Sequence, residues 1–133
     1  MILAIILAFL FVFASHVYTE AFFVQRAHLE IGRAIGYDLN QIIQLNSLSS
    51  YQGVGFAKIF RWIILIVMFY FYGWKMPVGL YILEFLYITF RPIPEWHYQE
   101  VMQWFGVVVS QDKSLGSLYV KAQNILRSKG INV

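Results

Sequence analysis

Two apolar stretches decide the fold class of this chain: WIILIVMFYFYGW at residues 62–74 and MPVGLYILEFLYITF at residues 76–90. Lys75 separates them, and Glu84 is the one charged residue inside either stretch. Runs of this length and composition are typical of helices buried in a membrane or in a protein core. Because the two runs follow each other so closely, they predict two helices joined by a tight turn.

The segment between the stretches has the composition of a turn at a membrane surface. Gly73 and Pro77 interrupt a helix, and Trp and Lys residues favour the interface between lipid and water. Each arm is short for a full crossing, which takes about 20 residues. The long side chains of Arg61, Lys75 and Arg91 lengthen the reach of the arms by snorkelling. We therefore predict a transmembrane helical hairpin at residues 56–91, with a re-entrant hairpin as the alternative.

Outward from this hairpin, the next apolar region is the N-terminus. Residues 1–14, MILAIILAFLFVFA, are uninterrupted apolar, and the apolar character continues to Val24. We predict an N-terminal transmembrane helix at residues 1–25. A cleaved signal peptide is the alternative, but a positively charged start is absent and residues 13–15 make a poor cleavage site.

The composition supports a membrane protein over other classes. Hydrophobic residues make up 59% of the chain and charged residues only 13%, against about 25% charged in an ordinary soluble domain. Such a chain is too hydrophobic to be disordered. It has no cysteine, which excludes disulfide scaffolds, iron–sulfur clusters and thiolate-bound haem. The basic residues are scattered singly, so we expect no nucleic-acid partner.

Two polar regions flank the hairpin. Residues 26–55 form a predicted loop with a short amphipathic helix after Asp38, since Leu39, Ile42 and Leu45 recur at helical spacing. Residues 92–133 form a predicted amphipathic helical region after the prolines that end the hairpin. The fold class is thus all-α integral membrane, with about three transmembrane helices, amphipathic interfacial helices and no β-sheet.

The last predicted helix carries an apolar stripe at i, i+3, i+4, i+7 spacing. An exposed stripe of this kind usually marks an interface, so we expect it to bind a partner protein. Its members are Leu115, Leu118, Tyr119, Ala122, Ile125 and Leu126.

The charges predict an orientation. With three spans, residues 26–61 and 91–133 lie on one side and hold nine of the ten Lys and Arg residues. Lys75 alone lies opposite. Basic flanks stay in the cytoplasm, or in the mitochondrial matrix. We predict an inner or plasma membrane, bacterial or mitochondrial, with the N-terminus outside and the C-terminus on the cytoplasmic or matrix side.

Glu84 is the sharpest candidate for a site. It lies seven residues, or about 10 Å of helix, beyond Pro77 and hence near the middle of the bilayer. A carboxylate there is a functional candidate because its burial is costly. It is either a proton or cation site, with Tyr81 and Tyr87 nearby, or a structural group that is protonated or paired with a basic residue of a partner subunit.

A second candidate is a polar cluster of His16, Glu20, Arg61 and Arg91 at the inner membrane interface, where helix rise predicts similar depths. Such a cluster could contact a quinone, haem, pigment or anionic lipid headgroup. The alternative is four independent interfacial residues. His97 and Glu100 are spaced to face one metal ion, but the carboxylates are too scattered for a metal site, so we expect neither metal nor cofactor.

The chain has no motif for a nucleophile, a phosphate loop or a dinucleotide site, so we do not expect an enzyme. The first hypothesis is a small non-catalytic subunit that stabilises, assembles or docks a larger inner-membrane complex. Its partners would be the lipid bilayer and other membrane-protein subunits. The alternatives are a homo-oligomeric channel or small transporter that uses Glu84, and a quinone-, pigment- or haem-contacting membrane subunit.

Overall fold

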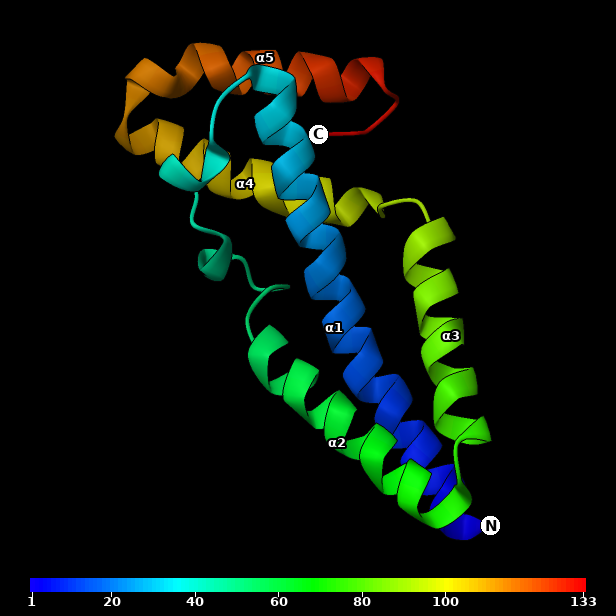
Figure 1. The fold of residues 1–133 in the computed structure, drawn as a ribbon. Helices are drawn as coiled ribbons and strands as arrows, with labels where there is room; N and C mark the ends of the chain where they lie inside the picture. Colours follow the sequence, from blue (N-terminus) through cyan, green and yellow to red (C-terminus); the bar gives the residue numbers. More distant parts are fainter. The chain divides into compact units, whose positions relative to one another are not determined.

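The structure, a computed structural model, describes all residues 1–133 and is entirely helical (Figure 1). The prediction of an all-α chain without a β-sheet is confirmed. Three short 3-10 helices lie at Leu39–Gln41, Leu45–Ser47 and Lys113–Leu115. The α-helices are α1 (Ile2–Ile35), α2 (Val54–Tyr72), α3 (Lys75–Phe90), α4 (Glu95–Gln111) and α5 (Gly116–Ser128).

Two helices, α1 and α2, are long and apolar enough to cross a membrane. The number rises to three if α3 and α4 are counted together as one bent span. By itself α3 has 16 residues, about 24 Å of helix, which is short of a hydrocarbon core of about 30 Å.

The chain divides into two compact units, and α1 contributes to both. Unit 1 consists of residues 1–21 and 53–92, and unit 2 of residues 22–52 and 93–133. The predicted hairpin therefore lies in unit 1, and the predicted C-terminal helical region lies almost wholly in unit 2. Each unit has a hydrophobic core of its own.

Unit 1 contains the start of α1 together with the α2–α3 hairpin. Gly73 ends α2 with a φ of 77°, a left-handed conformation that costs glycine little, and its N–H donates to the carbonyl oxygen of Phe69. Pro77 falls in the first turn of α3, where a proline is tolerated. The core joins one face of α1 to one face of α2, through Leu7, Phe11, Ala14, Ile64, Leu65 and Met68.

Unit 2 packs the end of α1 and the connecting loop against α4 and α5. The aromatic rings of Phe105 and Tyr119 stack with centroids 5.4 Å apart and connect α4 to α5. The buried core residues of unit 2 are Val24, Ala27, Ile31, Ile35, Leu39, Ile43, Leu48, Tyr98, Val101, Met102, Phe105, Ala122 and Leu126.

The predicted amphipathic helix after Asp38 is wrong. Asp38 does cap a helical turn, since its Oδ1 accepts from the N–H of Asn40 at 3.1 Å, but that turn is a 3-10 helix of three residues. A second 3-10 helix follows at Leu45–Ser47. Isolated helices shorter than about 12 residues are marginal, and the Asn, Gln and Ser residues here compete for backbone hydrogen bonds. The apolar residues instead enter the core of unit 2 one by one.

The predicted partner surface on α5 also needs correction. Ala122 and Leu126 are each 1% exposed and belong to the core of unit 2, and Leu118 and Tyr119 pack against that core. Leu115 and Ile125 are half-buried. The chain itself covers this stripe, because α4 presents a matching apolar face. The stripe is therefore not a free surface for another protein.

Candidate functional site

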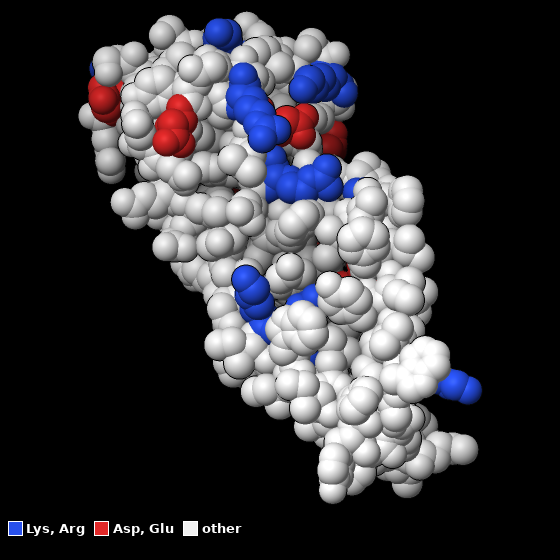
Figure 2. All heavy atoms as spheres, viewed as in Figure 1, with Lys and Arg blue, Asp and Glu red and all other residues white.

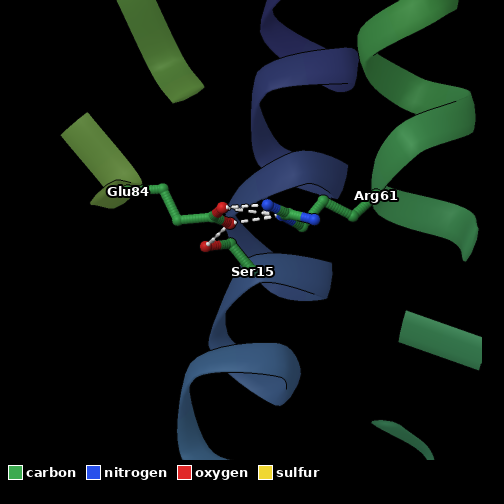
Figure 3. A network of polar contacts seen from close by, with 3 residues as sticks. All are labelled: Ser15, Arg61 and Glu84. Atoms are coloured by element: carbon green, nitrogen blue, oxygen red, sulfur yellow. Dashed lines mark hydrogen bonds and ion pairs between the residues drawn. The ribbon is translucent and has the colours of Figure 1, made fainter. Parts of the chain in front are cut away.

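The most unusual feature of unit 1 is a buried ion pair between its two hairpin helices (Figure 3). Arg61 lies in α2 and Glu84 in α3, and the two residues are 5% and 6% exposed. The Nε of Arg61 donates to both carboxylate oxygens of Glu84, each at 2.7 Å. A terminal guanidinium nitrogen also contacts Oε1.

A hydroxyl group and three aromatic rings surround this pair. From α1, the hydroxyl of Ser15 donates to Oε2 of Glu84 at 2.6 Å, so all three helices of unit 1 meet at one carboxylate (Figure 3). The ring of Tyr18 lies 4.4 Å from the guanidinium carbon of Arg61, a distance at which a cation–π interaction is favourable. The rings of Trp62 and Tyr81 lie 5.4 and 5.8 Å from the same carbon.

The geometry of the ion pair indicates that it holds the helices together. A buried charge is costly unless an opposite charge and hydrogen bonds compensate it, and both oxygens of Glu84 have such partners. A guanidinium that contacts both oxygens of a carboxylate is also held in a defined orientation. The pair therefore fixes α2 against α3, and Ser15 fixes both to α1.

Two expectations from sequence are corrected here. Glu84 has its basic partner in the same chain, whereas the sequence suggested a partner subunit. Arg61, which the sequence grouped with Arg91 in an interfacial cluster, forms an ion pair with Glu84 inside the bundle. The sequence contains a signal for this pairing, namely the distance of each residue from the turn. Arg61 is eleven residues before Tyr72, about 16 Å of helix, and Glu84 is nine residues after Lys75, about 14 Å.

The other members of the predicted cluster also lie in unit 1. His16 is exposed, and Glu20 and Arg91 are half-buried. The guanidinium of Arg91 lies 5.0 Å from the ring centre of Tyr87. Of the four residues, Arg61 forms the ion pair with Glu84, and the predicted cluster as a whole stays a prediction.

His16 lines a groove between α1 and α3 of about 340 Å³. Its polar groups are the hydroxyls of Ser15, Thr19 and Tyr87, the His16 imidazole and the edge of Glu84. Phe11, Val12, Leu80 and Leu83 supply apolar walls. The groove thus combines polar hydrogen-bonding groups with an apolar lining, as small-molecule sites commonly do.

A second groove, between α2 and α3, is wholly apolar and also measures about 340 Å³. Three of the aromatic residues of the hairpin line it. The lining residues are Trp62, Leu65, Ile66, Phe69, Pro77, Val78 and Tyr81. It has no polar group to orient a ligand, and its composition suits a lipid chain or an apolar helix.

In unit 2, Glu100 joins α4 to the connecting loop. Its Oε1 accepts from the Ser49 hydroxyl at 2.6 Å and from the Ser50 N–H at 3.1 Å, and its Oε2 accepts from the Ser50 hydroxyl at 2.6 Å. Burial by itself raises the pKa of Glu100, but the bonds from Ser49 and Ser50 outweigh it and hold that pKa below its usual range.

The histidines of unit 2 serve packing. His28 is 2% exposed, and its Nε2 donates to the carbonyl oxygen of Ile43 at 2.9 Å. His97 is fully buried beside the rings of Phe23 and Trp96, with centroid distances of 6.2 and 5.6 Å. The structure brings no group of three or more His, Cys, Asp or Glu residues together that could hold a metal ion.

Comparison with known protein families, curated proteins and solved structures finds no match to this chain.

Proposed function

We propose that the chain is a small non-catalytic membrane subunit that stabilises, assembles or docks a larger protein complex of an inner or plasma membrane. The observation that carries the proposal is the surface of unit 1. Most of its large apolar side chains point outward, among them Ile63 at 51% exposed, Phe69 at 60% and Phe85 at 59%. A bundle this small buries little surface of its own, so lipid and neighbouring subunits must cover the rest.

Charge supports the same placement. Figure 2 shows unit 1 mostly without charge, while Lys, Arg, Asp and Glu gather on unit 2. If α1, α2 and α3 all cross the bilayer, the Arg61–Glu84 pair lies about 14–16 Å from the turn and close to the middle of a core of about 30 Å. A charged side chain at that depth is costly unless an opposite charge pairs with it.

The orientation follows from the remaining basic residues. With Arg61 inside the bundle and Lys75 at the turn, the other eight Lys and Arg residues fall on the side of the C-terminus. Short loops rich in Lys and Arg stay in the cytoplasm or matrix. We therefore place the N-terminus outside and the C-terminus inside.

The hydrogen-bonded and paired state of the Glu84 carboxylate favours a role as a subunit over a role as a channel. A conducting site must release its ion, which requires a group that can exchange partners. Glu84 accepts bonds from Arg61 and Ser15 and is 6% exposed. A homo-oligomeric channel or transporter that uses Glu84 would lose its flux in Glu84→Gln, whereas a subunit would lose only stability.

The groove between α1 and α3 supports a second candidate, a quinone- or pigment-contacting subunit. Its mixture of hydroxyls, an imidazole and apolar walls suits a flat ligand with a polar head. An absorbance spectrum and an organic extract of the purified protein decide this candidate. A colourless protein without an extractable quinone would exclude it.

Purification of the full-length tagged chain from its own membrane in a mild detergent tests the main proposal. We expect one or more membrane proteins to co-purify in a fixed ratio, and to be absent when an unrelated three-span protein with the same tag is purified in parallel. A chain that emerges alone, or as an oligomer of itself only, would contradict the proposal.

A further inference from the structure

Unit 2 contains a pocket of about 510 Å³ whose polar walls are dominated by basic residues. Arg26 and Arg33 project from α1, and Lys129 follows the end of α5. Glu30 is the one acidic residue in the lining, and Leu29 and Ile93 supply apolar contacts. Figure 2 shows the blue and red side chains of unit 2 close together on its surface.

The carboxylate of Glu30 is already engaged. Its Oε2 accepts from the Tyr98 hydroxyl at 2.6 Å, and its Oε1 pairs with the Nζ of Lys129 at 3.3 Å. Burial, and then the bond to Glu30, raise the pKa of Tyr98 above its usual range, so this hydroxyl stays a donor. Glu30 thus holds Lys129 at the pocket.

The charges of the pocket do not cancel. Three basic side chains against one carboxylate leave a formal excess of two positive charges. Arg26 and Arg33 are seven residues apart, two turns or about 10 Å along the same face of α1. Guanidinium groups bind phosphate oxygens with paired hydrogen bonds, and two of them can approach one phosphate from both sides.

The sequence positions of the residues that line the pocket indicate its level in a membrane. Arg26 comes two residues after Val24, where the apolar stretch of α1 ends, and Ile93 comes three residues after the end of α3. Both walls therefore begin where a proposed span leaves the hydrocarbon. The headgroup layer there is roughly 5–7 Å thick, and it is the layer that contains lipid phosphates. This step rests on the membrane insertion proposed above, but not on the subunit role.

We propose that this pocket binds a phosphate group, and that the phosphate belongs to an anionic phospholipid of the inner leaflet. Arg26, Arg33 and Lys129 contact the phosphate, and Leu29 and Ile93 contact the glycerol and the first part of the acyl chains. Basic pockets on the cytoplasmic or matrix side are suited to anionic headgroups. A soluble phosphorylated compound offers the same phosphate chemistry without the acyl chains.

The test uses the purified full-length protein in an uncharged detergent. Binding is titrated with short-chain phosphatidylglycerol, with short-chain phosphatidylcholine and with inorganic phosphate, and is followed by tryptophan fluorescence and thermal unfolding. The test variant is Arg26→Gln/Arg33→Gln. The matched control is Lys113→Gln/Lys121→Gln, which removes two exposed basic residues of unit 2 outside the pocket.

We expect phosphatidylglycerol to bind the wild type and the control alike, more tightly than phosphatidylcholine. The test variant should bind it about thirtyfold more weakly, the size expected from losing two basic contacts at a membrane surface. Arg26→Lys/Arg33→Lys keeps the charge and should bind with intermediate affinity, which separates lost binding from a failure to fold. Binding should also weaken with rising salt.

Two results would overturn the proposal. Equal binding by the test variant and the control would show that the pocket is not the site. Phosphatidylcholine binding as tightly as phosphatidylglycerol would show that the acyl chains alone are recognised. If inorganic phosphate binds as tightly as the lipid, the phosphate site stands, but the lipid as its source is excluded.

Discussion

Glu84 shows how one residue organises a small bundle. Its carboxylate receives Arg61 from α2 and Ser15 from α1, so a single side chain connects the three helices of unit 1. The bundle has little apolar driving force of its own in a membrane, because lipid is as apolar as its core. Polar contacts of this kind then contribute disproportionately to the choice of one packing arrangement.

The ion pair predicts a strongly non-additive mutant series. Arg61→Leu leaves Glu84 buried without its counter-charge, and we expect it to lower the free energy of unfolding by about 3–5 kcal/mol. The double variant Arg61→Leu/Glu84→Leu removes both charges, and we expect it to recover most of that loss. Both free energies of unfolding are measured by titrating the detergent-solubilised proteins with a denaturing detergent. A single variant as stable as the wild type would contradict the assignment.

Glu100 predicts a pH dependence in unit 2. Its pKa is lowered in the folded chain, so its ionised form favours folding above about pH 4.5, the value of an unperturbed Glu, and this contribution is lost as the pH falls through the lowered pKa. Glu100→Gln should cost about 1–2 kcal/mol at neutral pH. The difference from the wild type should shrink on acidification in parallel unfolding titrations. A constant difference from neutral to acidic pH would rule out this role.

Among the elements, α1 ends in a well-defined capping motif. The N–H of Gly36 donates to Arg33 O, and the N–H of Tyr37 donates to Gly32 O at 3.0 Å. This pair of bonds is the Schellman motif, and Gly36 takes its left-handed position with φ of 69°. The motif stops α1 at Ile35 and turns the chain toward Leu39, which enters the core of unit 2.

Gly36→Ala therefore tests the end of α1. A Cβ at Gly36 meets no neighbouring atom, so the expected cost, about 1 kcal/mol, comes from the left-handed backbone alone. Gly55→Ala is the matched control, because Gly55 has ordinary helical geometry and equally open surroundings. We expect the control to be neutral or slightly stabilising. Thermal unfolding followed by circular dichroism compares them, and equal midpoints would contradict the prediction.

For the whole molecule, the distribution of basic residues predicts the membrane topology. The chain passes between the units three times, near residues 21, 53 and 92. If α1, α2 and α3 each cross the bilayer as proposed, the termini lie on opposite sides of the membrane. In the proposed topology, eight of the ten Lys and Arg residues, all but Arg61 and Lys75, lie on the side of the C-terminus, as the positive-inside rule favours.

Reporter fusions measure this topology directly. A reporter inserted at Lys75 should be active only outside the cytoplasm or matrix, and one fused after Val133 only inside. Adding basic charge at the turn, for example with Tyr72→Lys/Trp74→Arg at two exposed positions, should weaken this bias, because the positive-inside rule counts basic residues in short loops. A cytoplasmic reading at Lys75 in the unaltered chain would contradict the orientation.

Part of the site was readable in the sequence and part was not. Glu84 stands out as one charge in 28 residues of hairpin arms, and Arg61 and Glu84 lie at similar distances from the turn, eleven and nine residues. Ser15 gives no such signal, because a serine in an apolar helix is common and the register of α1 against the hairpin depends on side-chain packing. The basic pocket was also hidden, since Lys129 is 96 residues from Arg33 in the chain.

The sequence by itself determined the all-helical class, the hairpin and its turn, and the separation of charge from apolar surface, because these depend on local composition and periodicity. The tertiary structure alone decided that the apolar residues of the connecting loop enter the core of unit 2 from two 3-10 turns, Leu39–Gln41 and Leu45–Ser47, that the α5 stripe packs on its own chain, and that Arg61 binds Glu84. Each of these depends on a neighbour from a distant segment. Packing and charge pairing between such segments outweigh local helix propensity, which is worth only tenths of a kcal/mol per residue.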